Sequence, residues 1–166
     1  PLNSAVLSVD IFKSGTRFNV LPEEAHLEGT TRCFSKEVND NFPEIIRRIA
    51  KETAASYRAE ADLEYDKLTL PLINDPYMAE VGKKSIKNLF GEESLTHLEK
   101  TTGGEDFSFF ANKVPAAFAF VGSKNENKLD YYPHHNSRFN IDEDSLEIAS
   151  ALYVQFALNF LKDKQL

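Results

Sequence analysis

The sequence predicts a mixed α/β protein, in which a small α+β unit built on a sheet is followed by part of an α/β layer. Two early runs, 5–12 and 25–34, alternate apolar and polar residues with the period of two that strands have. Three later stretches repeat apolar residues at helical spacing. Between the last two of these, Pro115–Gly122 is a short and nearly continuous apolar run, which is typical of a strand buried on both faces.

The first two strands are predicted at Ala5–Phe12 and Ala25–Phe34. On the first strand, Leu7, Val9 and Ile11 share one face because side chains alternate along a strand. On the second strand, the residues expected to point inward are Ala25, Leu27, Thr31 and Cys33. This pattern favours an antiparallel sheet with one face in water.

A helix follows, and the sequence leaves its start open. Ser35 is an early candidate for the cap, whereas Asn41 has capping-box spacing and would place Pro43 in the first turn. The apolar stripe of this helix is Phe42, Ile45, Ile46, Ile49 and Thr53. Ala61–Asp66 alternates again and predicts a third strand. The order strand, strand, helix, strand is most of a ferredoxin-like β-α-β-β-α-β unit without its first strand and helix.

Prolines and capping residues at 70–76 interrupt the pattern and predict a boundary between domains of residues 1–72 and 73–166. Asp75 is the expected cap of the next helix, because a proline follows at the first helical position. Gly91 is the expected stop of that helix.

The final helix is expected to begin at Asp142 or Asp144. Its apolar stripe is Leu146, Ala149, Leu152, Tyr153, Phe156 and Phe160. Both late helices need a sheet to cover, yet the second segment contains only one convincing strand, at 116–121. A single strand leaves its backbone donors and acceptors unpaired, so this segment is expected to be part of a larger α/β layer.

Composition excludes several classes of function. The chain of 166 residues is 42% hydrophobic and 27% charged, as a globular chain is. Its net charge of −7 argues against nucleic acid as a partner. No apolar run approaches the about 20 residues that span a bilayer, and the N-terminus lacks the pattern of a signal peptide. We therefore expect no membrane partner and a cytoplasmic location, with which the single cysteine, Cys33, agrees.

The residues with chemistry to offer are concentrated in Thr101–Asp144. His134 and His135 lie in the long loop after the apolar run, and imidazole is the commonest protein ligand for zinc and similar metals. On spacing alone, a histidine pair in a loop is more often a surface feature than a metal site.

A second candidate site is the run Gly103, Gly104, Glu105 and Asp106. In a functional interpretation, the glycines let the backbone approach a substrate closely while the acids orient ligands. In a structural interpretation, which the sequence alone favours, the glycines form a turn and Asp106 caps a short helix at 107–112.

Asn19 is a third candidate, because an amide side chain can donate to a developing oxyanion or to a substrate carboxylate. The structural alternative is a turn residue, since asparagine is common in turns. The sequence leaves both interpretations open.

Several blocks of sequence carry a resemblance to a known family. The later blocks are GGEDFSFF from Gly103, KVPAAFAFVG from Lys113 and HHNSRFNIDEDSL from His134. The earlier blocks are GTRFNVLPE from Gly15 and LEGTTR from Leu27. In this order they resemble the C-terminal part of metal-dependent amidohydrolases and metallopeptidases of the aminoacylase, hippurate hydrolase, N-acetyldiaminopimelate deacetylase and indole-acetyl-amino-acid hydrolase type.

The resemblance implies a fold for each segment. Residues 1–72 would be a partial ferredoxin-like dimerisation (lid) domain, and residues 73–166 the C-terminal part of an α/β zinc-peptidase-like catalytic domain. It also implies a homodimer that forms through the small domain. Because Pro1 cannot be a natural initiator, we expect that the first half of such an enzyme is missing from this chain.

The resemblance also implies the chemistry. The complete enzyme would use two divalent metal ions, zinc, manganese, cobalt or nickel, to hydrolyse the amide bond of N-acyl amino acids or small peptides. His135 would be one metal ligand, and His134 a neighbour that packs or forms hydrogen bonds. The residues that would bind substrate are Asn19, Gly103, Gly104 and Glu105. No catalytic residue is assigned, because the general base and bridging carboxylate belong to the missing half.

We therefore expect this chain by itself to bind metal weakly at most and to be inactive, since a catalytic zinc needs about three protein ligands. The alternative function is a non-catalytic dimerisation or small-ligand-binding module built on the ferredoxin-like half. In that case the histidine pair would be incidental.

Overall fold

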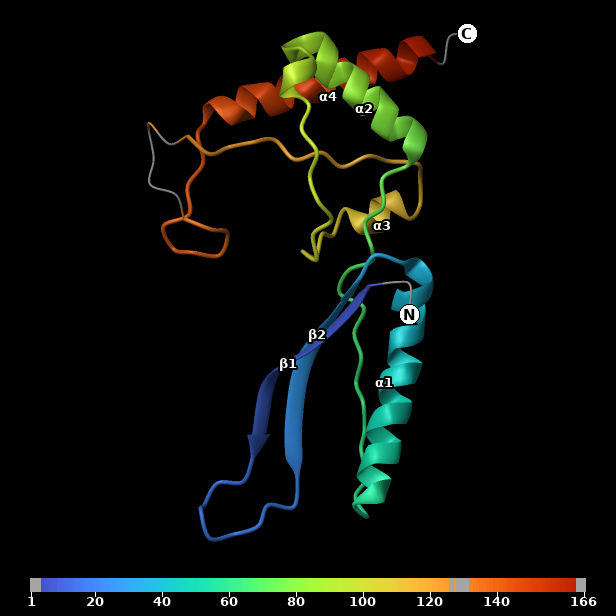
Figure 1. The fold of residues 1–166 in the computed structure, drawn as a ribbon, viewed down its shortest axis with the longest axis vertical. Coiled ribbons are helices and arrows are strands. Elements are labelled where there is room, and N and C mark those ends of the chain that lie inside the picture. The colour runs from blue at the N-terminus through green and yellow to red at the C-terminus, as the bar shows by residue number, and fades with distance from the viewer. Residues whose placement is uncertain (1–3, 126, 128–131, 164–166) are drawn as a thin grey trace. The chain divides into compact units, whose positions relative to one another are not determined.

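A computed structural model describes residues 4–125, 127 and 132–163. The chain is a mixed α/β protein that forms two compact units (Figure 1). Unit 1 contains Pro1–Ile73 and Lys100–Lys113, and unit 2 contains Asn74–Glu99 and Val114–Leu166. The domain division at residues 72 and 73 stays a prediction.

The sheet of unit 1 is an antiparallel hairpin of β1 (Ala5–Ser14) and β2 (Ala25–Cys33), as Figure 1 shows. Both strands lie close to their predicted positions, although β1 continues two residues beyond Phe12. Among the described residues no other strand joins this sheet.

The ladder contains a bulge that the alternation of the sequence could not show. Val9 lies opposite Gly29 and Ile11 lies opposite Glu28, so Asp10 is the extra residue on β1. One extra residue moves every later side chain to the other face of the strand. The prediction that Ile11 shares the face of Val9 is therefore wrong.

Phe12 takes the place of Ile11 on that face, opposite Leu27. Both side chains are largely exposed, at 72% and 55%. The prediction that Ala25 and Leu27 point inward is wrong, because nothing in the described chain covers this end of the hairpin. Thr31 and Cys33, at the other end of β2, are half-buried as predicted.

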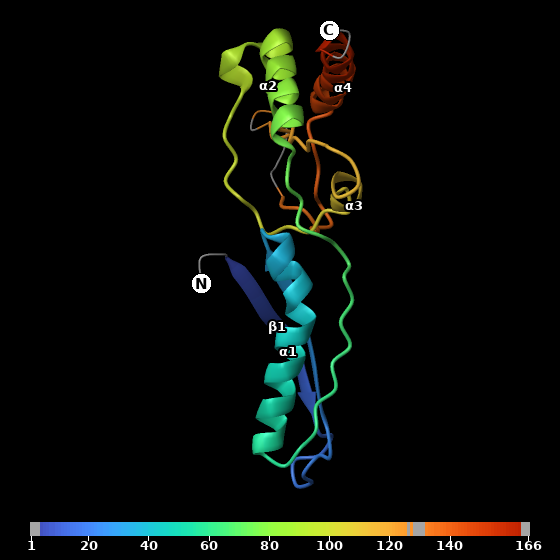
Figure 2. The ribbon, with the colours of Figure 1, turned by 90° about the vertical axis from the view of Figure 1, so that its right-hand side faces the viewer.

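The next element is α1 (Lys36–Ser56), which lies beside the hairpin (Figure 2). Its cap is Ser35, whose side-chain oxygen accepts the N–H of Val38 at 3.5 Å. Of the two predicted starts, the earlier one is confirmed. Pro43 consequently lies inside the helix rather than in its first turn.

The apolar stripe of α1 is covered at one end only. Phe42 is buried with 8% exposure, whereas Ile45 and Ile49 are 45% and 51% exposed. These two residues follow Phe42 at spacings of three and seven and so lie on the same side of the helix. The sheet is too small to cover the whole stripe.

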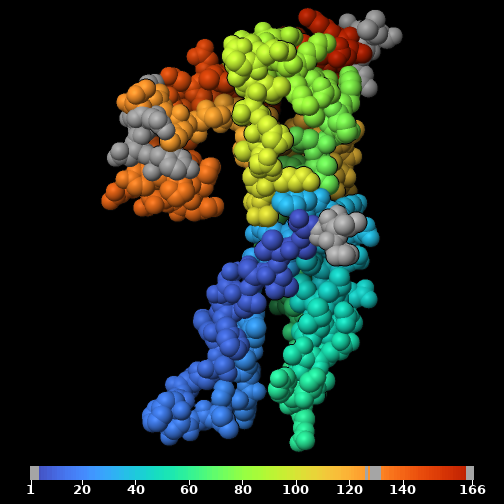
Figure 3. Space-filling model, in the orientation of Figure 1, coloured from blue at the N-terminus to red at the C-terminus, as the bar shows by residue number. Residues whose placement is uncertain are grey.

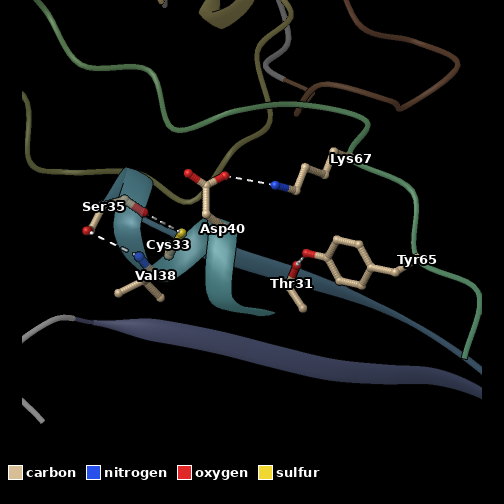
Figure 4. A network of polar contacts seen from close by, with 7 residues as sticks. All are labelled: Thr31, Cys33, Ser35, Val38, Asp40, Tyr65 and Lys67. Atoms are coloured by element: carbon tan, nitrogen blue, oxygen red, sulfur yellow. Dashed lines mark hydrogen bonds and ion pairs between the residues drawn. The ribbon is translucent and has the colours of Figure 1, made fainter. Parts of the chain in front are cut away.

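The third strand predicted at Ala61–Asp66 is wrong, because this segment makes no ladder with any described residue. Its side chains still alternate between half-buried and exposed. Side chains hold it in place: Thr31 Oγ1 and Tyr65 Oη share a hydrogen bond of 2.6 Å, and Lys67 Nζ donates to Asp40 Oδ1 at 2.8 Å (Figure 4). Alternation reports which face is covered, whereas a strand also needs a neighbour for its backbone.

The short helix α3 (Ser108–Ala111) also belongs to unit 1 and falls inside the predicted range of 107–112. Ser108 is fully buried, and its Oγ accepts the backbone N–H of Leu70 at 3.1 Å. This bond ties the end of the extended segment to the chain around α3.

Unit 2 begins with α2 (Pro76–Phe90), which starts and ends where the sequence predicts. Asp75 Oδ1 accepts the N–H of Met78 at 3.0 Å. Gly91 ends the helix with a φ of 87°, a value that residues with a Cβ rarely adopt. The 3-10 helix η1 (Glu92–Ser94) follows.

The last helix is α4 (Asp144–Asp163), which begins at the later of the two predicted positions and packs on α2. Part of its predicted apolar stripe is exposed, with Leu146 at 57% and Tyr153 at 80%. No helix in the described part of the chain is both long and apolar enough to cross a membrane.

A buried polar contact joins α2 to α4. Asn159, which is 4% exposed, donates from Nδ2 to Ser85 Oγ at 2.9 Å. Ser85 is fully buried and donates to the carbonyl of Val81, while Gln155 donates to Asn159 Oδ1 at 3.0 Å. Because each polar group here has a partner, the contact sets how the two helices meet without leaving a buried donor unsatisfied.

Pro115–Gly122 is extended but is not a strand, so the predicted buried strand is wrong. Its backbone is bonded by a side chain: the N–H of Phe118 donates to Asn74 Oδ1 at 2.8 Å, and Asn74 Nδ2 donates to the carbonyl of Phe118 at 2.9 Å. Phe120 is 70% exposed. Ala116, Ala117, Phe118 and Val121 are half-buried, and the N–H of Asp75 donates to the carbonyl of Ala116 at 2.8 Å. The apolar run therefore has no ladder and only partial cover within the described chain.

The first prediction concerns pH. The hydrogen bond from Lys67, aided by the lysine charge, holds the pKa of the Asp40 carboxyl below its ordinary value of about 3.9. A carboxyl with a lowered folded-state pKa stabilises the fold above its unfolded pKa, and this contribution is lost as pH falls through the folded value. Asp40→Asn is therefore expected to lower the urea midpoint slightly at about pH 7, and to match the wild type once the pH has fallen through the folded-state pKa of Asp40.

The matched control is Asp66→Asn, which removes an exposed carboxylate beside Lys67 that forms no ion pair with a described residue. It should leave the urea midpoint, followed by circular dichroism, unchanged at about pH 7. A pH-independent loss in Asp40→Asn would contradict the assignment to its charge.

The second prediction concerns the contact between α2 and α4. Asn159→Ala removes the donor to Ser85 and leaves a small cavity, so we expect a loss of about 1–3 kcal/mol in the free energy of unfolding. Urea unfolding measures it. The control Asn88→Ala, at an exposed position of α2, should change the value by less than about 0.5 kcal/mol. Equal effects of the two variants would contradict the role of the buried contact.

Candidate functional site

The loop before α4 places His135 in an unusual backbone conformation. His135 is exposed and has a φ of 68°, in the left-handed region that residues with a Cβ adopt rarely. Among the described residues only Arg58 shares such a value without being glycine. Backbone strain of this kind is concentrated at functional sites, so the conformation supports His135 as a candidate functional residue.

The two histidines of the pair have different surroundings. The ring of His134 packs on Phe139, with ring centroids 4.5 Å apart. His135 makes no such ring contact, and its side chain forms no hydrogen bond to another described residue. His134 is thus engaged inside the loop, whereas the imidazole of His135 remains available to a ligand.

The same loop contains a contact that the sequence did not predict. Arg138 donates to Tyr132 Oη at 3.0 Å, and its guanidinium lies 5.5 Å from the centre of the Tyr132 ring. The only feature of the sequence that indicates this contact is an arginine six residues after a tyrosine. Such a spacing is too common to predict a contact between the two side chains.

The described residues do not complete a metal site. No group of three or more His, Cys, Asp or Glu side chains among them could hold a metal ion. The imidazole of His135 suits zinc or a similar ion as one ligand, but a catalytic zinc needs about three protein ligands. The described residues can therefore supply one ligand of a metal centre, and the other ligands would have to come from elsewhere.

Gly103 and Gly104 lie in an extended stretch of unit 1, and neither has a positive φ. A Cβ on Gly104 would come within 3.3 Å of Thr69 Oγ1, whereas one on Gly103 would meet its nearest atom at 3.9 Å. At Gly104 it is thus close packing on Thr69, and not backbone conformation, that disfavours a side chain. The turn that the structural interpretation expects at these two glycines is not found, because neither lies in a turn.

Glu105, and not Asp106, supplies the side-chain bond at the start of the short helix. Glu105 Oε1 accepts the N–H of Phe107 at 3.1 Å, and its carbonyl accepts the N–H of Ser108 at 3.2 Å. The cap position of α3 is Phe107, which makes no side-chain cap bond. The prediction that Asp106 caps this helix is wrong, because the helix starts one residue later than expected.

Asn19 lies in the turn between β1 and β2, where the N–H of Val20 donates to the carbonyl of Arg17 at 3.4 Å. Its side chain is exposed and forms no hydrogen bond within the described structure. The position agrees with a turn residue and leaves the amide free to contact a ligand.

The structure does not bring the candidates of unit 1 together. Asn19 is at the tip of the hairpin, which stands clear of α1 in Figure 3. The run from Gly103 to Glu105 follows Lys100, whose ammonium lies 5.7 Å from the ring of Phe34 at the opposite end of β2. His135 belongs to unit 2. The substrate-binding set of Asn19, Gly103, Gly104 and Glu105 stays a prediction.

Comparison with known proteins identifies the family. The model of peptidase family M20/M25/M40 matches residues 6–159, which is most of the chain. The chain belongs to this family. The match includes both the Asn19 turn and the His135 loop.

Two curated relatives show how much of an M20 protein the chain covers. Thermostable carboxypeptidase 2 of Saccharolobus solfataricus is 31% identical over 96% of this chain and 40% of its own length. N-acetylcysteine deacetylase of Bacillus subtilis is 32% identical over 97% of this chain and 40% of its own length. The chain spans about two fifths of the length of these relatives.

A solved structure has the same fold. A Bacillus subtilis protein, described as a dinuclear metal-binding peptidase of the M20 family, has a TM-score of 0.81 and 32% identity. The similarity covers 95% of this chain and 42% of that protein. The mixed α/β architecture is therefore that of an M20 peptidase segment.

The packing of Gly104 on Thr69 leads to a prediction. Gly104→Ala must push Thr69 aside, so we expect it to lower the free energy of unfolding by about 1–3 kcal/mol. The matched control Gly103→Ala has room for the added methyl group and should change it by less than about 0.5 kcal/mol. Urea unfolding of both variants provides the comparison, and equal losses would contradict the packing role.

Proposed function

We propose that this chain is the C-terminal portion of a metal-dependent amidohydrolase that cleaves the amide bond of N-acyl amino acids or small peptides. The observation that carries the proposal is the M20 family match over residues 6–159. The names of two relatives, thermostable carboxypeptidase 2 and N-acetylcysteine deacetylase, support this substrate class. Exposed apolar faces on α1 and α4 agree with a chain that is completed by further layers.

His135 is proposed as a ligand of one metal ion. The chemistry that two bound divalent ions supply is polarisation of the amide carbonyl and a lowered pKa of an attacking water. The role of this chain is to hold the imidazole of His135 at a fixed place. The exposed position and constrained backbone of His135 support this role. Zinc, manganese, cobalt and nickel all accept an imidazole ligand. Which of these metals is bound would depend on the remaining ligands of the centre, which this chain does not supply.

Substrate binding is proposed for the Asn19 amide and for the run from Gly103 to Glu105. The exposed amide of Asn19 can donate to the substrate carboxylate or to the oxyanion that develops at the carbonyl. Glu105 Oε1 is bonded to the N–H of Phe107, so Oε2 is the oxygen that remains for a substrate donor. These groups orient a substrate and do not transfer its protons.

Unit 1 is proposed to be a partial ferredoxin-like lid domain through which two copies of the protein form a homodimer. The free edge of β1 supports this, because in the described sheet β1 pairs with β2 alone. Val6 and Val9 on β1 are 46% and 53% exposed and would gain cover in such an interface. A cytoplasmic location is proposed on the single cysteine, which is half-buried and free.

The alternative is a non-catalytic association or small-ligand module. The absence of a cluster of three metal-binding side chains among the described residues favours it. The two proposals differ in what precedes the chain in its coding sequence. A histidine-rich metal motif upstream supports the amidohydrolase, and a reading frame that begins near Pro1 supports the module.

The prediction that tests the proposal compares the two histidines in the full-length gene product. His135→Ala is expected to remove about one metal ion per chain and to lower the hydrolysis of N-acetyl amino acids by more than about 100-fold, because a metal ligand is lost. His134→Ala removes only a packing contact with Phe139 and should cost less than about 10-fold. Metal content by mass spectrometry and kcat/KM provide the measurements.

Unchanged metal content in His135→Ala would contradict its assignment as a ligand. The 166-residue chain by itself is expected to retain almost no metal after dialysis and to show no hydrolysis. Hydrolysis by that chain would show that the site is complete within it.

A further inference from the structure

The left-handed backbone of His135 needs a local cause. A φ of 68° is unfavourable for any residue with a Cβ. The residue is also exposed, so burial of its side chain does not hold it there. The cause must lie in the bonds made by its neighbours.

Asn136, the next residue, makes three hydrogen bonds inside the loop. Its N–H donates to the carbonyl of Pro133 at 3.2 Å, and its own carbonyl accepts the N–H of Phe139 at 2.9 Å. Its side-chain Oδ1 accepts the N–H of Arg138 at 2.8 Å. The bond to Pro133 spans His134 and His135, and the other two bonds fix the chain after Asn136. Together they hold Asn136 in place on both sides and leave His135 little freedom.

The residue on the other side of His135 is also engaged. His134 packs its ring on Phe139, whose N–H is bonded to Asn136. The three contacts close a small ring of residues from Pro133 to Phe139. Within this ring, the side chain of His135 has no partner among the described residues.

We propose that Asn136 is a positioning residue that holds the backbone of His135 so that its imidazole faces the metal. The inference rests on the proposed function of His135 as a metal ligand. Of the three bonds, the one from Oδ1 depends on the side chain, since the other two are made by the backbone. An amide oxygen that accepts the N–H two residues later is the bond that asparagine and aspartate form in turns.

This placement explains why a metal ligand sits on an exposed loop rather than on a helix or strand. A ligand must be held close to its productive geometry, and an exposed loop does not do this by packing. A turn that is bonded to itself performs the same task. Groups that support metal ligands in this way typically contribute about 10–100-fold to metal affinity.

The test uses Asn136→Ala, Asn136→Asp and the control Asn140→Ala. Alanine removes the Oδ1 acceptor, whereas aspartate keeps an oxygen at the same place. Asn140 lies in the same loop, and its Oδ1 accepts the N–H of Ile141 at 2.9 Å, away from the His135 turn. Each variant is made in the 166-residue chain and in the full-length gene product.

The first measurement is the backbone conformation of His135, from Cβ chemical shifts and HN–Hα couplings in the labelled 166-residue chain. Asn136→Ala is expected to shift His135 out of the left-handed region, while Asn136→Asp and Asn140→Ala keep it. The second measurement is the affinity of the full-length protein for cobalt, followed by its visible absorption. Asn136→Ala should weaken cobalt about tenfold or more, with Asn136→Asp within about threefold of wild type. Circular dichroism confirms that each variant is folded.

The outcomes separate this inference from the proposed function. If His135→Ala loses cobalt and Asn136→Ala does not, the positioning role is overturned and the ligand assignment stands. If His135→Ala binds cobalt as the wild type does, the ligand assignment is overturned and the positioning role falls with it. Loss of affinity in Asn136→Ala with His135 still left-handed would overturn the backbone explanation.

Discussion

Every amphipathic helix needs an apolar surface to cover, and the described chain provides one sheet of two strands. The consequence is visible in the exposed area of 13802 Å². Two separate compact domains, each of half the 18.8 kDa mass, would expose about 10,000 Å². Among the described apolar residues only Phe42 and Val81 are buried. The architecture therefore calls for further layers, and an M20 enzyme of which this chain is a portion would provide them.

The same constraint explains which elements the sequence could predict. The caps of Ser35 and Asp75 depend on atoms within three residues, so local sequence is enough to find them. The strands expected at 61–66 and 116–121 depend on a distant neighbour for their backbone bonds, and neither segment forms a ladder with a described residue. The second segment receives a backbone bond from the N–H of Asp75 to the carbonyl of Ala116, but this bond does not make a strand. The predicted alternation of exposure is present at 61–66. The strand prediction is wrong because alternation of side chains does not by itself provide a neighbouring strand.

The bulge at Asp10 shows a second limit. The alternation of a strand assigns each residue to a face by counting from the first residue. A single extra residue moves every later residue to the other face, and the sequence does not show where this happens. The sequence thus placed Ile11 on the face that Phe12 occupies. In the candidate site a similar limit applies: the sequence located His135 and Asn19, but backbone conformation decides which way a side chain points. The sequence His-His-Asn does not predict that His135 has a φ of 68°.

That conformation separates two neighbouring histidines that composition treats as equivalent. A residue in the left-handed region turns the chain sharply, so the side chains before and after it diverge. His134 turns onto Phe139 and becomes part of the loop, and His135 is left exposed. The division of roles follows from backbone geometry and from the bonds of Asn136. Both imidazoles are exposed, but one packs on Phe139 and the other has no partner among the described residues. Such a loop can therefore supply a metal ligand without a hydrophobic core behind it.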